Sequence, residues 1–401
     1  MMSSIRAKHI FFFLYTLFII YGSLFPLSGW RIPWVSLLDS WRFAAGDHLS
    51  RSDLITNFLG YIPLGFLLCS VLSDRFRRFV LIALTVIIGT SLSFCMEYCQ
   101  LYLPDRTSSL FDLLFNIFGV LSGGFLYCHL KKGMSFGHTI RLWRDACFHE
   151  GWVADIGIAV VVAWSATQLI PFIPTFDVGE LKNGLKPIFF ALRNISLFNE
   201  SYFFVYMLNI CSLGMVLLLI AKRCVWIPLW LGLFCGTVLL AKITIVGRQL
   251  SLEALFGLLG GVLLVELLRR VSKNSCALFG AICVFAAFVI DELRPEIAQS
   301  IGSYDFNVVP FANHFAGKGV SEAGSIISGL WPFATLGFFA LHYSSDSGRR
   351  IPVILITLTL AGAVFLMEYA QSFIIGRYPD ITTVALAVIG WWIPFVTISL
   401  D

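Results

Sequence analysis

Long apolar stretches alternate with short polar loops along the whole chain. Each stretch has about 20 residues, the length that an α-helix needs to cross the hydrocarbon core of a bilayer. Soluble domains carry about a quarter charged residues, whereas this chain is 58% hydrophobic and 13% charged. The pattern therefore predicts an all-α fold, a polytopic transmembrane helical bundle of twelve spans at about residues 9–26, 54–73, 79–101, 110–130, 153–174, 200–221, 225–245, 250–268, 276–293, 324–343, 351–375 and 380–399.

The distribution of Lys and Arg predicts the orientation of the chain. With the N-terminus inside, the cytoplasmic loops hold 16 of the 28 Lys and Arg residues and 7 of the 24 Asp and Glu residues. Short cytoplasmic loops of membrane proteins carry such an excess of positive charge. We therefore expect both termini in the cytoplasm, and the basic balance needs no nucleic-acid partner.

An internal repeat predicts how the spans are grouped. A Leu-Gly pair stands early in the second span of each group of four, at Gly65, Gly214 and Gly337. An even number of spans gives every group the same orientation, so the repeats are parallel. The predicted four-helix units are 1–135, the most intact copy, then 150–272, the degenerate copy, and 275–401. A basic cytoplasmic linker, 136–149, joins the first two, either as a surface helix or as a plain solvated segment.

The second half of the unit also repeats. "EYCQLYLPDR" (97–106) and "EYAQSFIIGR" (368–377) have Glu, Tyr, Gln and Arg at the same offsets, and the middle copy keeps only "VGR", ending at Arg248. After it, "LEALFGLLGG" (252–261) aligns with "FDLLFNIFGV" (111–120) if one loop residue is lost. That alignment pairs Gly260 with Gly119.

Polar residues gather where the outer half of the bilayer is expected. In the first copy, Glu97 and Gln100 share a helix face, Arg106 follows in a short turn, and Asp112 and Asn116 lie on one stripe of the fourth span. Charges there are tolerated only when they face one another or a wet cavity. The candidate ligand-binding residues over the three copies are Asn57, Glu97, Gln100, Arg106, Asp112, Asn116, Arg248, Glu253, Glu368, Gln371, Arg377 and Asp380.

Two interpretations of this polar group stay open. It is either a binding or catalytic site, or a tertiary clamp that holds the third and fourth helices together. The chain has no Walker loop, no dinucleotide glycine pattern, no HExxH and no GxSxG. We therefore expect neither a metal nor an organic cofactor, and no residue is assigned a catalytic role.

The first copy resembles the VanZ-like family of bacterial integral membrane proteins. "NFLGYIPLGFLL", followed by "EYCQLYLPDRTSSLFDLLFNIFGVLSGG", has that family's pattern, and the similarity covers residues 50–125. A partial second copy lies near 325–395, with Thr335, Thr383 and Ala387 at three motif positions. The family often has an Asp three residues after the Arg, where the first copy has Ser109 and the third has Asp380. The residues that match are Asn57, Pro63, Gly65, Glu97, Gln100, Arg106, Asp112, Asn116 and Gly119.

The resemblance implies a role in the bacterial cell envelope and a place in the inner (cytoplasmic) membrane, because the family is named after a protein of glycopeptide resistance. Its expected partners are membrane lipids and a lipid-linked glycan precursor. The first hypothesis is a protein that binds or modifies a lipid-linked or anionic precursor of peptidoglycan or surface polysaccharide in an outer-leaflet pocket. In that pocket an Arg would hold a phosphate or carboxylate. The alternatives are a transporter or flippase of such a precursor and a non-catalytic scaffold with envelope-assembly protein partners.

Overall fold

The structure is a computed structural model whose described residues are almost entirely helical. Only two isolated β-bridges, Phe148 with Ala221 and Asn307 with Asp380, occur within them. An all-helical fold is therefore confirmed for this part of the chain. The described residues are 2–25, 29–46, 51–73, 75–104, 106–130, 136–222, 226–294, 306–308, 310, 320–347, 352–374, 377 and 379–398.

Nine helices in the described ranges are long and apolar enough to cross a membrane. Two shorter apolar helices, Phe11–Leu24 and Ile381–Val396, coincide with the first and last predicted spans. The predicted span 250–268 is a helix of 17 residues. A multi-pass membrane protein is thus supported, while the count of twelve spans stays a prediction. The long apolar helices are Leu54–Leu72, Arg78–Gln100, Leu110–Leu130, Trp152–Leu169, Glu200–Ile220, Ile227–Thr244, Lys273–Leu293, Gly324–Ser344 and Val353–Gln371.

The chain divides into two compact units. Unit 1 contains Met1–Arg144, and unit 2 contains Asp145–Pro171, Lys182–Gly317 and Ser321–Asp401. Two short segments, Phe172–Leu181 and Lys318–Val320, group with unit 1. The second and third predicted four-helix units thus fall in one compact body, and the division into three stays a prediction.

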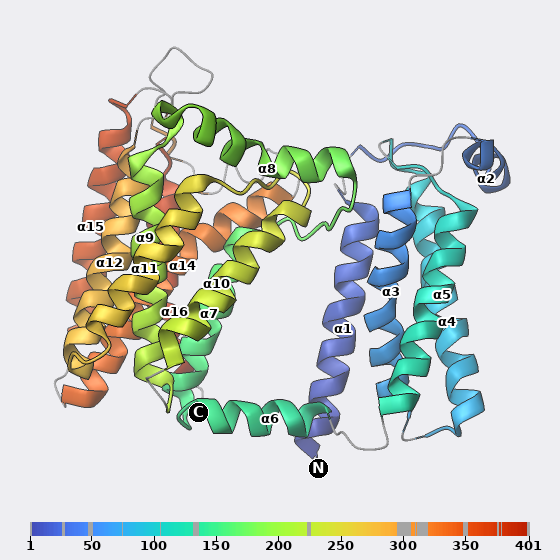
Figure 1. The fold of residues 1–401 in the computed structure, drawn as a ribbon, viewed down its shortest axis with the longest axis horizontal. Helices are drawn as coiled ribbons and strands as arrows, with labels where there is room; N and C mark the ends of the chain where they lie inside the picture. Colours follow the sequence, from blue (N-terminus) through green and yellow to red (C-terminus); the bar gives the residue numbers. More distant parts are fainter. Residues whose placement is uncertain are drawn as a thin grey trace. The chain divides into compact units, whose positions relative to one another are not determined.

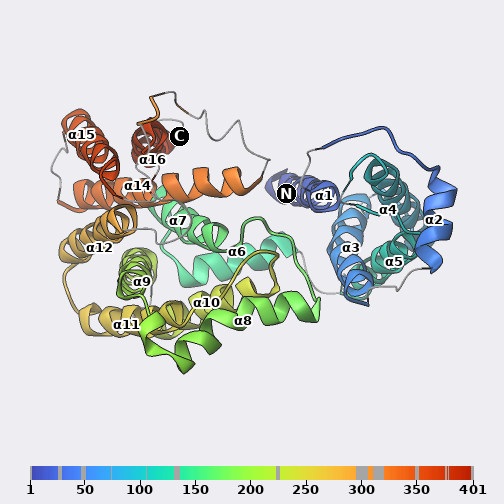
Figure 2. The same ribbon diagram turned by 90° about the horizontal axis from the view of Figure 1, so that it is seen from above.

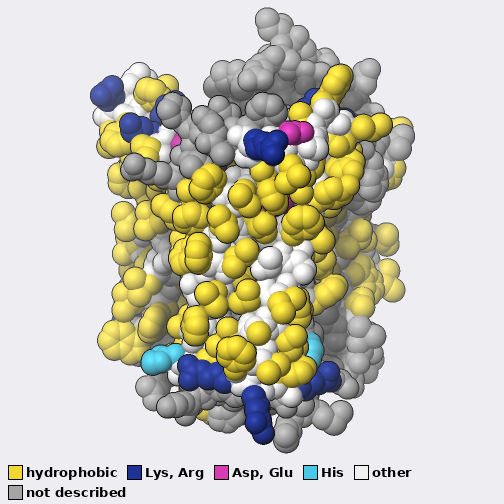
Figure 3. Space-filling view, turned by 90° about the vertical axis from the view of Figure 1, so that its right-hand side faces the viewer, with side chains coloured by type: hydrophobic (Ala, Val, Ile, Leu, Met, Phe, Trp, Pro, Cys, Tyr) yellow, Lys and Arg dark blue, Asp and Glu magenta, His cyan; other side chains and the backbone are white. Residues whose placement is uncertain are grey.

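Unit 1 consists of four helices side by side, and a short fifth helix lies at the outer edge of the bundle, in contact with α5 near one end (Figures 1 and 2). A band of hydrophobic side chains covers the face of this unit in Figure 3, with Lys and Arg at both ends of the band. That distribution is typical of a protein that crosses a bilayer. The four long helices are α1 (Met2–Leu24), α3 (Arg51–Leu72), α4 (Arg78–Gln100) and α5 (Leu110–Leu130), and the short one is α2 (Leu37–Gly46).

Glycine brings α3 and α5 into backbone contact. A Cβ atom added to Gly119 of α5 would lie 2.4 Å from the carbonyl oxygen of Phe58 and 2.9 Å from Cβ of Tyr61, both on α3. A Cβ added to Gly123 would lie 2.0 Å from the carbonyl oxygen of Ile62. Small residues allow such close packing where no hydrophobic force drives helices together inside the membrane. These glycines therefore fix how α5 lies on α3.

Unit 2 is built around α9, whose second half, Ile210–Ile220, is almost entirely buried. Both α11 and α12 pack along α9, and α7 also contacts it. The core includes the large buried side chains Trp164, Phe338 and Phe339. The helices of this unit are α7 (Trp152–Leu169), α9 (Glu200–Ile220), α10 (Ile227–Ala241), α11 (Leu252–Leu268), α12 (Lys273–Leu293), α14 (Val320–Ser347), α15 (Val353–Gln371) and α16 (Ile381–Ile398).

The same glycine contact occurs twice in unit 2. A Cβ added to Gly261 of α11 would lie 2.8 Å from the carbonyl oxygen of Met207 and 2.9 Å from Cβ of Ile210 on α9. A Cβ added to Gly390 of α16 would lie 2.5 Å from the carbonyl oxygen of Leu330 on α14. Gly261, not Gly260, therefore makes the contact that Gly119 makes in unit 1. The predicted alignment, which assumed a lost loop residue and paired Gly260 with Gly119, is therefore shifted by one position.

Two amphipathic helices complete the described chain. The linker segment forms α6 (Phe136–Cys147), which agrees with the helical alternative for that segment. The second, α8 (Val178–Arg193), lies crosswise to α9 and α10 in Figure 1 and was not predicted. Its sequence mixes Lys, Gly, Pro and Phe over 16 residues, so no apolar run of membrane-spanning length marks it.

We expect Gly119→Ala to destabilise the protein by about 1–3 kcal/mol, the usual cost of overpacking a tight contact. The new methyl group would collide with backbone atoms, which cannot move aside as a side chain can. The measurement is thermal unfolding of the purified protein in detergent.

Gly60→Ala is the matched control, since a Cβ at Gly60 of α3 meets only Ile19 Cδ1, at 3.9 Å. Ala is favoured over Gly in a helix by about 1 kcal/mol, so this variant should be neutral or more stable. Equal destabilisation by both substitutions would contradict the backbone contact.

Candidate functional site

Arg106 caps the end of the first helix in unit 1. Its Nε donates a hydrogen bond of 3.0 Å to the carbonyl oxygen of Phe25, and its Nη2 donates one of 3.1 Å to that of Gly22. The last carbonyls of a helix have no partner inside the helix, and a cation there is favoured by the helix dipole. One guanidinium group therefore satisfies two main-chain acceptors at the end of α1.

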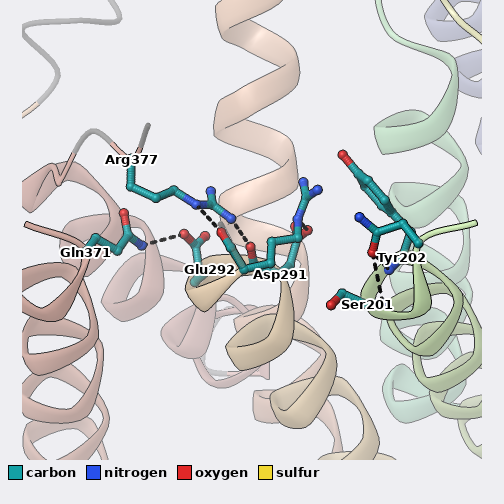
Figure 4. Close-up of polar contacts among 8 residues, drawn as sticks. Ser201, Tyr202, Asp291, Glu292, Gln371 and Arg377 are labelled. Carbon is teal, nitrogen blue, oxygen red and sulfur yellow. Dashed lines mark hydrogen bonds and ion pairs between the residues drawn. The ribbon is translucent and has the colours of Figure 1, made fainter. Parts of the chain in front are cut away.

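The other two predicted arginines make equivalent contacts in unit 2. Arg377 Nε donates to the carbonyl oxygen of Arg294 at 3.0 Å and Nη2 donates to that of Asp291, at the end of α12 (Figure 4). Arg248 Nε donates to the carbonyl oxygen of Ile170, which directly follows α7. All three arginines thus bind the end of the helix that opens their predicted copy.

Two of the predicted glutamates bind the opposite kind of helix end. Glu97 Oε2 accepts from Ser109 N at 2.8 Å and from Ser108 Oγ at 3.0 Å, just before α5 begins. Glu368 Oε2 accepts from Asp380 N at 2.9 Å, just before α16 begins. A carboxylate at a helix N-terminus satisfies main-chain donors and complements the dipole. Both glutamates are 2% exposed, so these bonds satisfy carboxyl groups that are almost fully buried.

Three further predicted residues, Glu253, Asp112 and Asn57, differ in their surroundings. Glu253 Oε1 accepts from Asn199 N at 2.8 Å, so it binds the start of α9. Asp112 lies in the first turn of α5, close enough to Glu97 for their charges to interact. Asn57 is half-buried on α3 and makes no hydrogen bond to the described residues.

A buried polar group of unit 1 contains atoms without partners. We define the unit-1 polar cluster as Tyr61, Ser93, Glu97, Gln100 and Asn116. Asn116 Nδ2 donates to Ser93 Oγ at 2.9 Å, and Gln100 Nε2 donates to the carbonyl oxygen of Ser23 at 3.0 Å. Asn116 Oδ1, Gln100 Oε1 and the Tyr61 hydroxyl are buried, yet within the described chain they have no hydrogen-bond partner of regular geometry. The Tyr61 hydroxyl lies close to Ser93, Glu97 and Ser23.

The third predicted copy has a comparable network with an additional carboxylate. Gln371 Nε2 donates to Glu292 Oε2 at 2.8 Å (Figure 4). Asp380 accepts from Thr382 N at 2.8 Å and from Asn307 Nδ2 at 3.2 Å. Glu292 was not among the candidate residues, although it stands beside Asp291 at the end of a predicted span.

Three further polar residues of unit 2 were not predicted. Lys242, six residues before Arg248, donates to Gln168 Oε1 and to the hydroxyl of Tyr206. Gln100 and Gln371 stand at the same distance before Arg106 and Arg377. That spacing is the signal that could have identified Lys242. No group of three His, Cys, Asp or Glu side chains suited to a metal ion occurs within the described ranges.

Sequence comparison identifies the family of the N-terminal part. The model of the VanZ/LLP1 family matches residues 11–131, which confirms the resemblance found in the first copy. The match begins within α1 and ends before α6, so it covers the long helices of unit 1. No match was found among curated proteins or solved structures.

We expect Arg106→Met to lower the free energy of unfolding by about 1–3 kcal/mol, because two carbonyls at the end of α1 lose a charged donor. Unfolding of the purified protein in detergent measures the effect.

Arg42→Met is the control. Arg42 is exposed and pairs only with Asp39 one turn away, so its removal should change stability little. Unchanged stability of Arg106→Met would mean that the cap contributes nothing measurable.

Proposed function

We propose that this VanZ-type membrane protein binds the headgroup of a lipid-linked envelope precursor at the unit-1 polar cluster. The precursor would be an intermediate of peptidoglycan or surface-polysaccharide synthesis. The observation that carries the proposal is the set of buried polar atoms without partners on Tyr61, Gln100 and Asn116. Most buried polar groups in proteins are hydrogen-bonded. Polar residues inside a membrane are costly, and for that reason they commonly mark a functional site.

The unpaired atoms favour a ligand that donates hydrogen bonds. Two of them are amide oxygens, which only accept, and the neighbouring Glu97 carboxylate also accepts when it is ionised. Hydroxyl groups of a sugar and N–H groups of an amide supply the donors that this cluster lacks. A glycan headgroup carries both kinds of donor, whereas a purely anionic group would face a carboxylate.

The direction of the chain and its compartment are part of the proposal. We take the N-terminus as cytoplasmic, in the cytoplasmic membrane of a bacterium, because the loops then follow the positive-inside rule. The unit-1 polar cluster would then open toward the outer leaflet.

Three copies of one four-helix unit are also part of the proposal. The glycine contacts of Gly119, Gly261 and Gly390 and the three arginine caps support it. The repeat does not require that all copies bind the same ligand, because the residues around the caps differ.

A scaffold is the second candidate function. The helix caps favour this function, because their residues have a structural role. The side chains that bind main-chain groups at helix ends are Glu97, Arg106, Glu368 and Arg377. In that case the polar residues stabilise a bundle whose outer surface binds other envelope proteins.

Asn116→Leu tests the headgroup proposal. The substitution keeps the size of the side chain but removes the unpaired Oδ1 together with the hydrogen bond from Nδ2 to Ser93 Oγ, so we expect the protein to fold with a loss of about 1–3 kcal/mol of stability. Native mass spectrometry of the protein purified with its lipids should show a bound glycolipid precursor in the wild type and its loss in the variant.

Two serines on α4 give a matched pair for the same measurement. Ser93 is fully buried and accepts from Asn116, whereas Ser91 is exposed and donates to its own helix. Ser93→Ala should reduce precursor retention and Ser91→Ala should not. Equal retention in all variants would rule out the unit-1 polar cluster as the binding site and favour the scaffold.

A further inference from the structure

A buried cation that has no counterion among the described residues lies in the middle copy. Lys242 is 6% exposed and follows α10 at the end of a predicted span. Its Nζ donates to the Tyr206 hydroxyl at 2.8 Å and to Gln168 Oε1 at 3.3 Å, and it lies 5.3 Å from the centre of the Tyr206 ring. Both acceptors are neutral. The ammonium group has three donors, so one N–H remains without an acceptor in the part of the chain that the structure describes.

Arg248 brings a second cation to the same place. Its Nε is used on the carbonyl oxygen of Ile170, and its two Nη groups have no acceptor among the described residues. Partial burial lowers the pKa of the Arg248 guanidinium, while the negative form of Tyr206 would raise it. Lys242 binds Gln168 and Arg248 binds Ile170, so both cations lie at the same end of α7.

No carboxylate of the described residues balances this pair. Neither Lys242 nor Arg248 forms an ion pair with an acidic residue in the described ranges. Glu253, the acidic candidate of this copy, is used at the start of α9. Burial of an unpaired charge costs several kcal/mol. The equivalent glutamines, Gln100 and Gln371, avoid that cost.

Helix α8 packs against the segment that carries the pair. Leu250 N donates to the carbonyl oxygen of Gly184 at 2.8 Å, and a Cβ at Gly184 would lie 3.2 Å from Cα of Ile243. The segment with Lys242 and Arg248 therefore lies directly against α8. Lys182, Lys186 and Arg193 of this helix are exposed, as are Phe189 and Phe190. A basic helix with exposed aromatic side chains is typical of one that lies in the membrane interface among anionic headgroups.

We propose that Lys242 and Arg248, beside Tyr206 and α8, bind the phosphate group of an anionic phospholipid. Arginine offers a planar fork that matches phosphate, and lysine adds a compact charge. The Tyr206 hydroxyl, which accepts from Lys242, has its own proton left to donate to a phosphate oxygen. This site lies in unit 2 and is separate from the headgroup site proposed for unit 1, so either can fail without the other.

A ligand role and a purely structural role of Lys242 predict opposite changes in protein stability when the lysine is replaced. If Lys242 only serves its two hydrogen bonds, its replacement destabilises the protein under all conditions. If Lys242 binds an anion, its replacement in the absence of that anion removes an unbalanced charge. The variant should then be at least as stable as the wild type without anionic lipid and should not respond when such a lipid is added.

The test uses thermal unfolding of the full-length protein in detergent with added phosphatidylglycerol, phosphatidylcholine or inorganic phosphate. A ligand that binds only the folded state raises the melting temperature by mass action. We expect phosphatidylglycerol to raise the wild-type melting temperature and phosphatidylcholine to raise it less. Lys242→Met and Arg248→Gln should reduce the affinity for phosphatidylglycerol about tenfold or more. If inorganic phosphate raises the melting temperature as much as phosphatidylglycerol does, the result would support the site and identify its ligand as a soluble anion.

Two further variants separate charge from hydrogen bonding. Lys242→Gln introduces the residue of the other copies, keeps a donor for Gln168 and Tyr206, and should also lose the lipid response. Lys222→Met removes an exposed lysine that binds the carbonyl oxygen of Asp145, and it should respond like the wild type. The proposal is wrong if Lys242→Met is less stable than the wild type under every condition, or if it keeps the response to phosphatidylglycerol.

Discussion

A helix inside a bilayer has no water to satisfy the main-chain groups at its ends, and the arrangement of this protein depends on how those groups are bound. The hydrocarbon core offers no hydrogen bonds, so the free carbonyls of one end and the free amides of the other need partners from the chain. Arg106, Arg248 and Arg377 supply the donors, and Glu97 and Glu368 supply the acceptors. The arginine Nε bonds reach a helix end that lies 78 to 83 residues earlier in the chain, whereas the glutamate bonds span 12 residues and fix the turn to the next helix.

The caps also explain why so many polar residues stand between two apolar helices. Arg106 and Glu97 belong to the same turn region of unit 1, but they bind different partners, the end of α1 and the start of α5. The turn is thus held from two sides. Gln100 lies on α4 and Asn116 lies on α5. Because the caps fix these two helices, they also fix the positions of the two unpaired amide oxygens.

Apolar run length was enough to predict the helices of membrane-spanning length, because that length depends only on the bilayer. The helices that it did not predict, α2 and α8, are amphipathic and short, and their burial depends on neighbours from distant sequence. The sequence also indicated that Arg106, Arg377 and the glutamates belong together, but not what they bind. Their partners are main-chain atoms, which every residue has, so no pattern of side chains could reveal them. The register of the middle copy follows from a constant spacing, since Arg106 to Arg248 and Gly119 to Gly261 are separated by equal numbers of residues.

The contact between glycine and a main-chain carbonyl has a consequence for how such a protein can change over time. Main-chain atoms are the same whatever the side chain, so the fit of the two helices does not depend on the residues around the glycine. In the register set by Gly119, Gly261 and Gly390, Asn116 corresponds to Leu258 and Ala387. The same backbone junction therefore carries an amide in one place and apolar side chains in the others. Architecture and chemistry are encoded by different atoms, and a bundle built in this way can acquire a new ligand without acquiring a new fold.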